Sequence, residues 1–534
     1  MCSFYLTSFI FRLFLIRYLS MKELDYKKTL IKLLGSSELD FVRALKQALP
    51  ELELYVVGGV VRDAILGRPC KDIDFVARNV PIEALQEALR NLGVVNLVGK
   101  HFGVLKFTPT DSKEGTLPFD IALPRTEHCG GTGGYRDVAV QSDHTMPLIE
   151  DLSRRDFTVN TMAWDVFAEN LIDEFDGMTD IKEKTIRAIG EPKDRFQDDY
   201  SRMLRALRFS VQLQFELSKN TLVAIKKMLP HINDEGNGIR VVPQETIAKE
   251  IMKSLVADPV ATLDLFDSVG AWEYLMPELL LMKNCPQHPE FHSEGDVWVH
   301  TRLALQKLAS KECEEFVDAR LPEYLKKLAR PLSPDNVVAV LLHDIAKPDT
   351  LQTPETHGVD RIRTHEHESV GAEKARAICE RLKLSSPQDV GIDVDRVVYL
   401  IRNHLIAAHG AIAMMKPTTI EKYFFKDPAL GADLLLMIFS DGSATITTGG
   451  IPALGVLHEM IDRINALLTQ FRQKTLAMKL PKPIIDGNEI MIALNLPPSK
   501  QIGSLIHAAR EAQLEGKITT KEEAIDYLKS LSET

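Results

Sequence analysis

The sequence predicts an α+β protein in which a small mixed β-sheet is followed by a mostly helical remainder. Three observations lead to this prediction. Residues 55–79 have the pattern of a strand, a glycine turn, a short helix and a second strand. Residues 94–109 and 119–123 alternate between apolar and polar side chains, as strands do. From residue 187 onward, helical spacing of apolar residues dominates.

Length and composition limit the class of protein. The chain has 534 residues, too many for one ordinary domain, so we expect about three or four modules. The net charge of −11 argues against a uniformly basic nucleic-acid-binding surface but is compatible with a local basic groove. The 6 cysteines show no Cys-x-x-Cys pairing. This favours reduced thiols in a cytoplasmic protein over a disulfide framework or a zinc knuckle.

The first residues have an unusual composition. Residues 4–19 are strongly apolar but contain two arginines. The segment is therefore too charged, and also too short, for a membrane span. The segment has no evident small-residue cleavage site of a signal peptide, and its lack of acids is compatible with a transit peptide. We expect residues 1–20 to be a leader or an over-extended reading frame and Met21 to be the functional start. An amphipathic helix is predicted over residues 22–49.

The segment from residue 55 to residue 79 contains the main chemical signal. The second strand is predicted to carry both Asp72 and Asp74, and because alternate side chains of a strand point the same way, the two project to the same face. Two neighbouring carboxylates repel each other unless a cation lies between them, and Mg²⁺ is usually held by one or two carboxylates and substrate phosphates. Gly58 and Gly59 allow the backbone to approach a triphosphate closely, and Arg62 is suited to a phosphate contact. The alternative is an ordinary strand–turn–helix with an exposed acidic pair.

The run GGVVRDAILG followed by KDIDF resembles the head of the polymerase-β-like nucleotidyltransferases. It is most similar to the class II CCA-adding tRNA nucleotidyltransferases and the related bacterial poly(A) polymerases. The resemblance implies metal-assisted nucleotidyl transfer to an RNA 3′ end. It also implies that the nucleotide is contacted by Gly58, Gly59, Arg62 and Asp63.

A third acid is predicted on another strand. Asp120 lies in the run FDIAL, and a neighbouring strand would place it beside Asp72 and Asp74. The resembled family has an acid followed by an arginine here, which correspond to Asp120 and Arg125. The resemblance implies that Asp120 assists deprotonation of the terminal 3′-OH and that Arg125 contacts the nucleotide.

Residues 130–147 are rich in glycine and polar residues and show no periodicity, which predicts a mobile loop. In the resembled family, a loop of this kind helps to change the specificity from C to A. Arg136 and Asp137 are candidates for a role in that change.

The run RRDFTVNTMA is similar to the second motif of the family, which favours ribonucleotides over deoxyribonucleotides. This implies that Asp156 bonds a ribose hydroxyl, that Arg155 bonds a phosphate and that Asn160 contributes to nucleotide binding. A solvated turn is the structural alternative for this charged stretch. The run LIDEFDGM that follows resembles the hairpin that closes the head.

The run DRFQDDYSRMLRALRFS predicts a helix with a charged side. Asp199, Arg202 and Arg205 are three residues apart, so they would line one side of that helix. Salt bridges within the helix are one explanation of this pattern. The run also resembles the family's fourth motif, which implies that Asp199 and Arg202 recognise the base. Arg205 and Arg208 would bind phosphate or stabilise the helix.

A second metal site is predicted in the helical part of the chain. Its candidate ligands lie on consecutive helical segments: His300, His343, Asp344, His367, His404 and Asp441. Mixed imidazole and carboxylate ligands suit a divalent transition metal better than Mg²⁺. The set resembles the HD phosphohydrolase domain, which implies phosphodiesterase and phosphatase activity towards 2′,3′-cyclic and 2′-phosphates. His292, His365 and His409 are the histidines most easily confused with these ligands.

These observations predict a division of the chain into five parts. They are a leader at 1–20, a nucleotidyltransferase head at 21–185, a helical neck at 186–285, an HD domain at 286–448 and a helical tail at 449–534. The tail resembles the part of the family that touches the tRNA elbow. Lys500, Arg510 and Lys517 are candidates for phosphate contacts there, and a solvated face is the alternative.

The combined prediction is an enzyme that builds or repairs the 3′ CCA of tRNA from CTP and ATP. Mg²⁺ in the head and a divalent transition metal at the HD site are the expected cofactors. We expect neither a membrane nor an obligate protein partner. Within the fold, the alternatives are a poly(A) polymerase or an enzyme that adds part of CCA, and VGKHFGVLKF favours CCA addition. A metal-dependent phosphohydrolase with an RNA-binding head is the alternative from another class.

Overall fold

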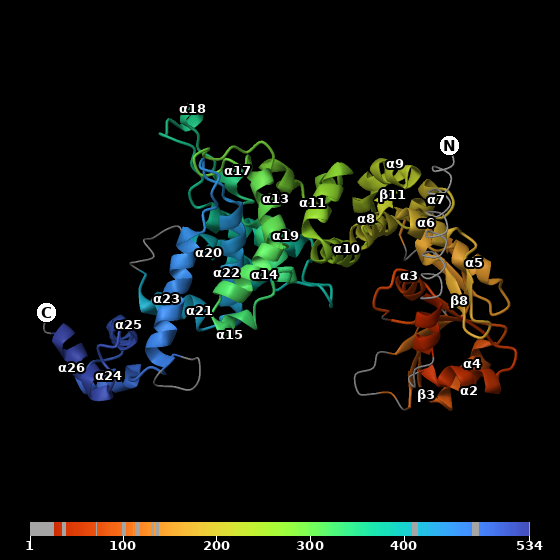
Figure 1. Ribbon diagram of the computed structural model, residues 1–534, viewed down its shortest axis with the longest axis horizontal. Helices are drawn as coiled ribbons and strands as arrows, with labels where there is room; N and C mark the ends of the chain where they lie inside the picture. The colour runs from red at the N-terminus through yellow and green to blue at the C-terminus, as the bar shows by residue number, and fades with distance from the viewer. Residues whose placement is uncertain are drawn as a thin grey trace, which may run out of the picture. The chain divides into compact units, whose positions relative to one another are not determined.

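The computed structural model describes residues 26–34, 39–70, 72–98, 103–110, 112, 118–129, 133–134, 138–407, 415–472 and 480–532. The chain divides into two compact units, Met1–Ile247 and Ala248–Thr534, which are considered separately below (Figure 1). The finer division into head, neck, HD domain and tail stays a prediction. Several sequence predictions fall outside the described residues: the leader at 1–20, Met21, Arg136, Asp137, His409 and part of VGKHFGVLKF.

The first unit contains a mixed seven-stranded sheet with the order β3-β4-β5-β2-β1-β8-β9. Its strands are β1 (Glu53–Val57), β2 (Asp74–Arg78), β3 (Gly93–Val98), β4 (Val104–Pro109), β5 (Phe119–Ala122), β8 (Ala163–Asp165) and β9 (Asn170–Ile172). β2 and β5 run parallel, and the other pairs of this sheet are antiparallel. The predicted mixed sheet is therefore confirmed, and the alternating residues 94–109 form the antiparallel pair of β3 and β4.

Helices pack on both faces of this sheet. On one face, Phe41 of α2 (Phe41–Ala48) places its ring against aromatic rings from three strands: Phe75, Phe107 and Phe119. On the other face, α5 (Leu148–Ser153) joins a buried cluster: Tyr55, Val57, Val76, Leu148, Leu152 and Ala163. Alternation along the strands separates these two sets, because successive side chains point to opposite faces.

The predicted loop at 130–147 is partly wrong. Val138–Ser142 forms strand β7, which pairs antiparallel with β6 (Arg125–Cys129). This strand is difficult to predict because β7 follows a glycine-rich stretch and contributes only five residues to a two-stranded sheet.

Helices make up most of the rest of the first unit. They are α3 (Gly59–Ile65), α4 (Ile82–Arg90), α6 (Gly177–Glu183), α7 (Pro192–Asp198), α8 (Ser201–Leu213), α9 (Lys219–Met228) and α10 (Gln244–Ala257), the last of which extends into the second unit. Residues 26–34 are also helical. Gln214 ends α8 in the left-handed conformation, with φ 56°, and the chain then reverses towards α9.

The second unit is helical. Its longer helices are α11 (Pro259–Ser268), α13 (Val297–Leu308), α14 (Lys311–Arg320), α16 (Pro334–Leu342), α19 (His367–Arg381), α20 (Val394–Asn403), α21 (Pro417–Phe424), α22 (Pro428–Ala444), α23 (Gly455–Arg472), α24 (Gly487–Leu494), α25 (Lys500–Leu514) and α26 (Lys521–Ser532). α22 is buried over most of its length and contacts α13, α16 and α20. An apolar helix of this kind forms the centre of a helical domain.

The C-terminal helices have clear N-terminal boundaries. Asp486 caps α24 with a capping box to Glu489. α25 begins at Lys500. Among the described residues, none of the helices combines the length and the apolar character that crossing a bilayer requires.

Candidate functional sites

The first site begins at the turn between β1 and α3. Gly58 has φ +81°, a conformation that residues with a Cβ rarely adopt. A Cβ at this position would lie 3.3 Å from Nη1 of Arg155 and 4.0 Å from Oδ2 of Asp74. The glycine therefore brings the backbone of the turn next to a guanidinium and a carboxylate.

Two of the predicted acids are neighbours across paired strands. Asp74 of β2 is the partner of Asp120 in the parallel strand β5, so both side chains point to the same face. Lys106 of β4 is paired with Asp120 from the other side, and its Nζ lies 3.1 Å from Oδ1 of Asp120. The pKa of Asp74 is raised to about 6, mainly by burial and to a smaller extent by the negative charge of Asp120. The two carboxylates thus repel each other, which favours a bound cation.

The predicted placement of Asp72 is wrong in one respect. β2 begins at Asp74, and Asp72 lies before the strand with φ +46°, exposed to solvent. Strand alternation therefore does not align the two side chains. The charge of Asp72 still contributes to the raised pKa of Asp74, so the turn leaves the two groups within electrostatic reach.

A chain of polar contacts links α3 to α8. Nη1 of Arg62 donates to Oδ1 of Asn160 at 2.6 Å, and Nδ2 of Asn160 donates to Oδ1 of Asp156 at 3.2 Å. Nε and Nη2 of Arg205 donate to Oδ2 of Asp156 at 2.8 and 2.5 Å. Arg62 also donates to both carboxylate oxygens of Asp63, at 3.0 and 3.1 Å. The structure thus brings together five of the predicted nucleotide-binding residues.

The central acid of this network is ionised. Burial alone would raise the pKa of Asp156, but Arg205, Asn160 and Arg202 outweigh burial and lower it to about 2. The salt bridge that was the alternative explanation of this stretch occurs between Arg202 and Asp198, whose Nη1 and Oδ2 are 3.8 Å apart. Arg205 bonds instead to Asp156, which lies far from it in the sequence.

Three of the predicted arginines lie around one aromatic ring. The guanidinium carbons of Arg62, Arg205 and Arg208 are 5.2, 5.5 and 4.1 Å from the centre of the Phe209 ring. Contact with the ring face stabilises cations at these distances. Nη1 of Arg208 also donates to Oε1 of Gln212 at 2.8 Å.

Asp151 is a buried acid that the sequence prediction missed. Its Oδ1 accepts from Nε and Nη2 of Arg154 at 3.0 and 2.7 Å and from the backbone N of Arg125 at 3.3 Å. Its Oδ2 lies 3.5 Å from Nη2 of Arg155. Asp151 precedes Arg154 and Arg155, which follow the last residue of α5, by three and four positions, and this spacing was the available signal.

The prediction that Asp199 lies on a helix with Arg202 and Arg205 is wrong. Asp199 has extended backbone angles between α7 and α8, and its Oδ1 accepts from the backbone N of Ser201 at 2.8 Å. Its short side chain favours such a turn over a helix interior. Arg202 lies on α8, where its Nη2 donates to the backbone O of Arg154 at 3.3 Å.

The second site lies in the helical unit and gathers all six predicted ligands from five segments of the chain. His300 lies on α13, His343 caps the end of α16 and Asp344 follows it, His367 begins α19, His404 caps the end of α20, and Asp441 lies in α22. Five of the six residues are buried: His300, His343, Asp344, His367 and His404.

The ligand atoms converge. Nε2 of His300 lies 3.0 Å from Oδ1 of Asp441 and 3.4 Å from Nε2 of His343. Oδ2 of Asp344 lies 3.3 Å from Nε2 of His343, and its Oδ1 lies 3.3 Å from Nε2 of His367. Although these contacts are short, neither oxygen of Asp344 forms a well-aligned hydrogen bond within the described part of the chain. A buried carboxylate whose oxygens lack well-aligned hydrogen-bond donors is suited to bind a metal ion.

The other ring nitrogens are fixed by hydrogen bonds. Nδ1 of His343, His367 and His404 donates to the backbone O of the residue three positions earlier, at 2.8, 2.7 and 2.6 Å. A carbonyl oxygen can only accept, so the proton lies on Nδ1 and the lone pair of Nε2 faces the cluster. The pKa of His404 is lowered to about 3, mainly by burial and to a smaller extent by the neighbouring His343, so the imidazole of His404 is neutral.

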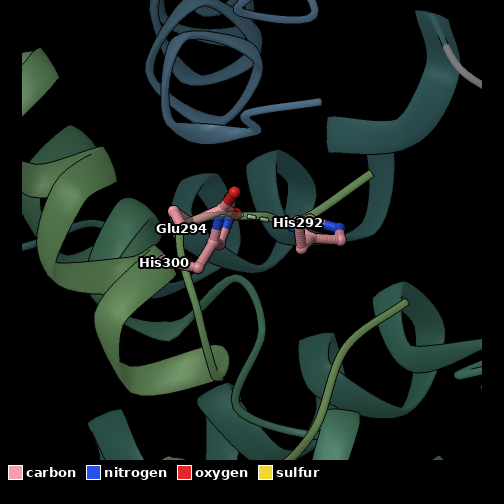
Figure 2. A group of neighbouring side chains, drawn as sticks. All are labelled: His292, Glu294 and His300. Atoms are coloured by element: carbon pink, nitrogen blue, oxygen red, sulfur yellow. Dashed lines mark hydrogen bonds and ion pairs between the residues drawn. The ribbon is translucent and has the colours of Figure 1, made fainter. Parts of the chain in front are cut away.

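Three further residues belong to this site and were not predicted as part of it. Oε1 of Glu294 accepts from Nδ1 of His300 at 2.9 Å and from Nδ1 of His292 at 2.7 Å (Figure 2). Nζ of Lys347 lies 2.7 Å from Oδ2 of Asp344. The position of Lys347 three residues after Asp344 was a usable signal. Nothing in the spacing of Glu294 indicated its contact.

Family models match the part of the chain that carries the acidic pair and the central part of the HD site, with His300 and Asp441 outside the second match. The model of the poly A polymerase head domain matches residues 54–187, and the model of the HD domain matches residues 320–436. The sheet with its acidic pair and the helical histidine cluster therefore define a nucleotidyltransferase that carries an HD domain.

Sequence relatives identify the family. The multifunctional CCA protein of Xanthomonas campestris is 33% identical over 345 residues, which cover 63% of this chain and 72% of the relative. That of an Acidovorax species is 29% identical over 468 residues, 86% of this chain and 95% of the relative. The chain belongs to the multifunctional CCA protein family.

Solved structures share the fold. The Bacillus stearothermophilus CCA-adding enzyme in complex with CTP has a TM-score of 0.58 and 21% identity, covering 92% of this chain and 96% of that one. The Thermotoga maritima CCA-adding enzyme complexed with tRNA has a TM-score of 0.51 and 19% identity, covering 94% of each chain.

Proposed function

We propose that this protein adds or repairs the 3′-terminal CCA of tRNA, using CTP and ATP. The observation that carries the proposal is the pairing of Asp74 with Asp120 beside the Gly58 turn, because it places two carboxylates of like charge where a nucleotide would enter. The names of the relatives and the CTP and tRNA complexes of proteins with this fold support the choice of substrates.

The donor atoms in the head fit Mg²⁺. They are carboxylate oxygens, and the charges of Asp120 and Asp72 add to the larger effect of burial in raising the pKa of Asp74. Asp72 and Asp74 would hold Mg²⁺, and when bound, one ion would lower the pKa of an attacking hydroxyl and another would steady the leaving pyrophosphate. Asp120 would accept the proton of the terminal 3′-OH, and Lys106 holds its carboxylate in place.

The remaining residues of the head would hold the nucleotide. Gly58 and Gly59 would let the backbone approach the triphosphate. Arg155 would pair with phosphate, since its Nε is buried without a hydrogen-bond partner among the described residues. Asp156 would accept from the ribose hydroxyl, and Arg62 and Asn160 fix its position through the network.

Base recognition would fall to Asp199 and Arg202. Their separation by the start of α8 gives one acceptor on an extended segment and one donor on a helix. Contacts to the Watson–Crick edges of cytosine and adenine would come from these two side chains. Arg205 and Arg208 would stabilise α8, on which Arg202 lies. Arg125 is proposed as a further nucleotide contact.

The HD site would hold a divalent transition metal between His300, His343, Asp344, His367, His404 and Asp441. When bound, the ion would polarise a phosphate and activate water for hydrolysis. We propose 2′,3′-cyclic and 2′-phosphates as substrates. Lys347 would balance the charge of Asp344 and fix its orientation. The tail at 449–534 is proposed to contact tRNA, and a cytoplasmic location is proposed for the whole protein.

The test uses purified protein and tRNAs that end before CCA, after C and after CC, with CTP alone, ATP alone or both. Growth to CCA and a stop there is the expected result. Addition of CC alone would make this a partial enzyme. A long run of A from ATP on RNA in general would make it a poly(A) polymerase. No incorporation, with phosphate ester hydrolysis intact, would favour a metal-dependent phosphohydrolase.

A further inference from the structure

The four histidines of the HD cluster differ in the group that accepts the hydrogen bond from Nδ1. In three of them, Nδ1 donates to a backbone carbonyl. In His300, Nδ1 donates to the carboxylate of Glu294. A carboxylate acceptor carries a full charge, so it makes the imidazole a stronger ligand and fixes its tautomer more firmly than a carbonyl does.

Glu294 is fully engaged in these contacts. Oε1 accepts from Nδ1 of His300 and from Nδ1 of His292, and the two rings meet edge to face at 89° (Figure 2). Oε2 accepts from the backbone N of Ile446 at 2.9 Å. The side chain of Glu294 is 4% exposed, and that of His300 is fully buried. A carboxylate with both oxygens bonded in this way is held in one orientation.

We propose that Glu294 is the residue that positions His300 as a metal ligand, with His292 as its supporting partner. The inference deepens the proposed function of the HD site and rests on it. Glu294 acts through His300, because its oxygens point to ring nitrogens and to the backbone and not to the converging Nε2 and carboxylate atoms.

The contact with Ile446 extends this role to a second ligand. Ile446 lies just after α22, which carries Asp441, and the backbone N of Thr445 donates to the backbone O of Asp441 at 2.9 Å. Nε2 of His300 lies 3.0 Å from Oδ1 of Asp441. Glu294 therefore connects the imidazole of His300 to the chain segment that holds its neighbouring carboxylate.

The experiment measures the binding of Co²⁺ to the full chain by equilibrium dialysis after removal of metal with a chelator. The parent carries Asp72→Asn and Asp74→Asn, so that the head does not contribute. Glu294→Ala is expected to lower the affinity about 10- to 100-fold. Glu294→Gln, which keeps one acceptor but not the charge, should fall between it and the parent. Glu290→Gln, an exposed glutamate of the same segment, should bind like the parent.

Hydrolysis of 2′,3′-cyclic AMP gives a second measurement. For a positioning residue, the metal concentration for half-maximal activity should rise while activity at saturating metal largely returns, which a misfolded site would not show. Affinity within twofold of the parent in Glu294→Ala, or in Glu294→Gln if the alanine variant does not fold, would overturn the role of Glu294. If His343→Ala also leaves Co²⁺ binding unchanged, the proposed metal site itself fails.

Discussion

Asp74 and Asp120 face each other as paired residues of the parallel strands β2 and β5, although 45 residues separate them in the sequence. Because the pair shares one face, loss of either carboxylate removes the negative charge that a cation requires. We expect Asp74→Asn and Asp120→Asn each to lower CCA incorporation by at least the 10- to 100-fold typical of a lost metal-supporting contact. Single-turnover incorporation on tRNA ending in CC measures this.

Glu83→Gln is the matched control for these variants, since Glu83 is an exposed acid on α4 of the same unit. It should incorporate nucleotides like the unaltered protein. Full incorporation by Asp74→Asn would contradict the proposed head site.

The pair of Asp156 and Arg205 should stabilise the first unit in a pH-dependent way. The pKa of Asp156 is lowered from 3.8 to about 2, which corresponds to about 2 kcal/mol. A lowered pKa means that this stability is present above about pH 4 and is lost as the pH falls towards 2. Asp156→Asn should therefore unfold more easily at pH 6, by about 2 kcal/mol, and this deficit should narrow by about 1 kcal/mol at pH 3.

Urea unfolding of both proteins at the two pH values measures the difference. Asp143→Asn is a useful comparison because Asp143 is an acid in the same unit whose side chain, within the described part of the chain, contacts Thr145 and His144. A deficit that is equal at pH 3 and pH 6 for Asp156→Asn would show that the pair with Arg205 does not set the pKa.

The activities proposed for the two sites should be separable by mutation. Nε2 of His343 lies among the converging ligand atoms of the HD site, whereas the head acids belong to the other compact unit. We expect His343→Ala to lower hydrolysis of 2′,3′-cyclic phosphate at least 10- to 100-fold and to leave CCA addition unchanged. His365→Ala, which removes an exposed histidine nearby, should retain both activities. A parallel loss of both activities in His343→Ala would argue against two independent sites.

Gly133 packs against the residue that precedes α8. It has φ +79°, and a Cβ there would lie 2.1 Å from the ring of Tyr200, whose backbone N donates to the O of Gly133 at 2.9 Å. Gly133→Ala should displace Tyr200 and the adjacent Asp199. We expect a loss of about 1 to 3 kcal/mol in stability, together with weaker nucleotide incorporation.

Gly190→Ala separates backbone strain from the clash. Gly190 has a similar φ of +65°, but an added Cβ would meet nothing within 4 Å. Thermal unfolding should therefore show a smaller loss for Gly190→Ala, of about 1 kcal/mol. Equal losses of stability in the two variants would mean that the clash with Tyr200 does not contribute to the effect of Gly133→Ala.

Sequence patterns predicted the elements with strong periodicity and were weaker where the chain turns. The alternation in β3 and β4 and the helical spacing around α13 and α16 gave the correct elements, since burial of one face imposes that spacing. Asp72 and Asp199 were assigned to a strand and a helix but lie just before them. A residue at an element's edge obeys local turn preferences, which a period cannot show.

The ligands of the HD cluster were found because histidine next to aspartate is distinctive, whereas Glu294 was missed. Its contacts depend on how a segment without regular structure folds back onto α13 and the end of α22. The partner of Asp156 was likewise hidden, since Arg205 reaches it from 49 positions away. Such contacts follow from the tertiary fold and not from local spacing.

The different supports of the four histidines affect how this protein can evolve. Nδ1 of His343, His367 and His404 is held by the main chain, which no single amino-acid replacement at the acceptor residue removes, apart from a change in the backbone path. Nδ1 of His300 is held by a side chain that one codon specifies. Natural variation or laboratory selection can therefore change the hydrogen bond that supports His300 in small steps, while the hydrogen bonds of the other three histidines stay constant.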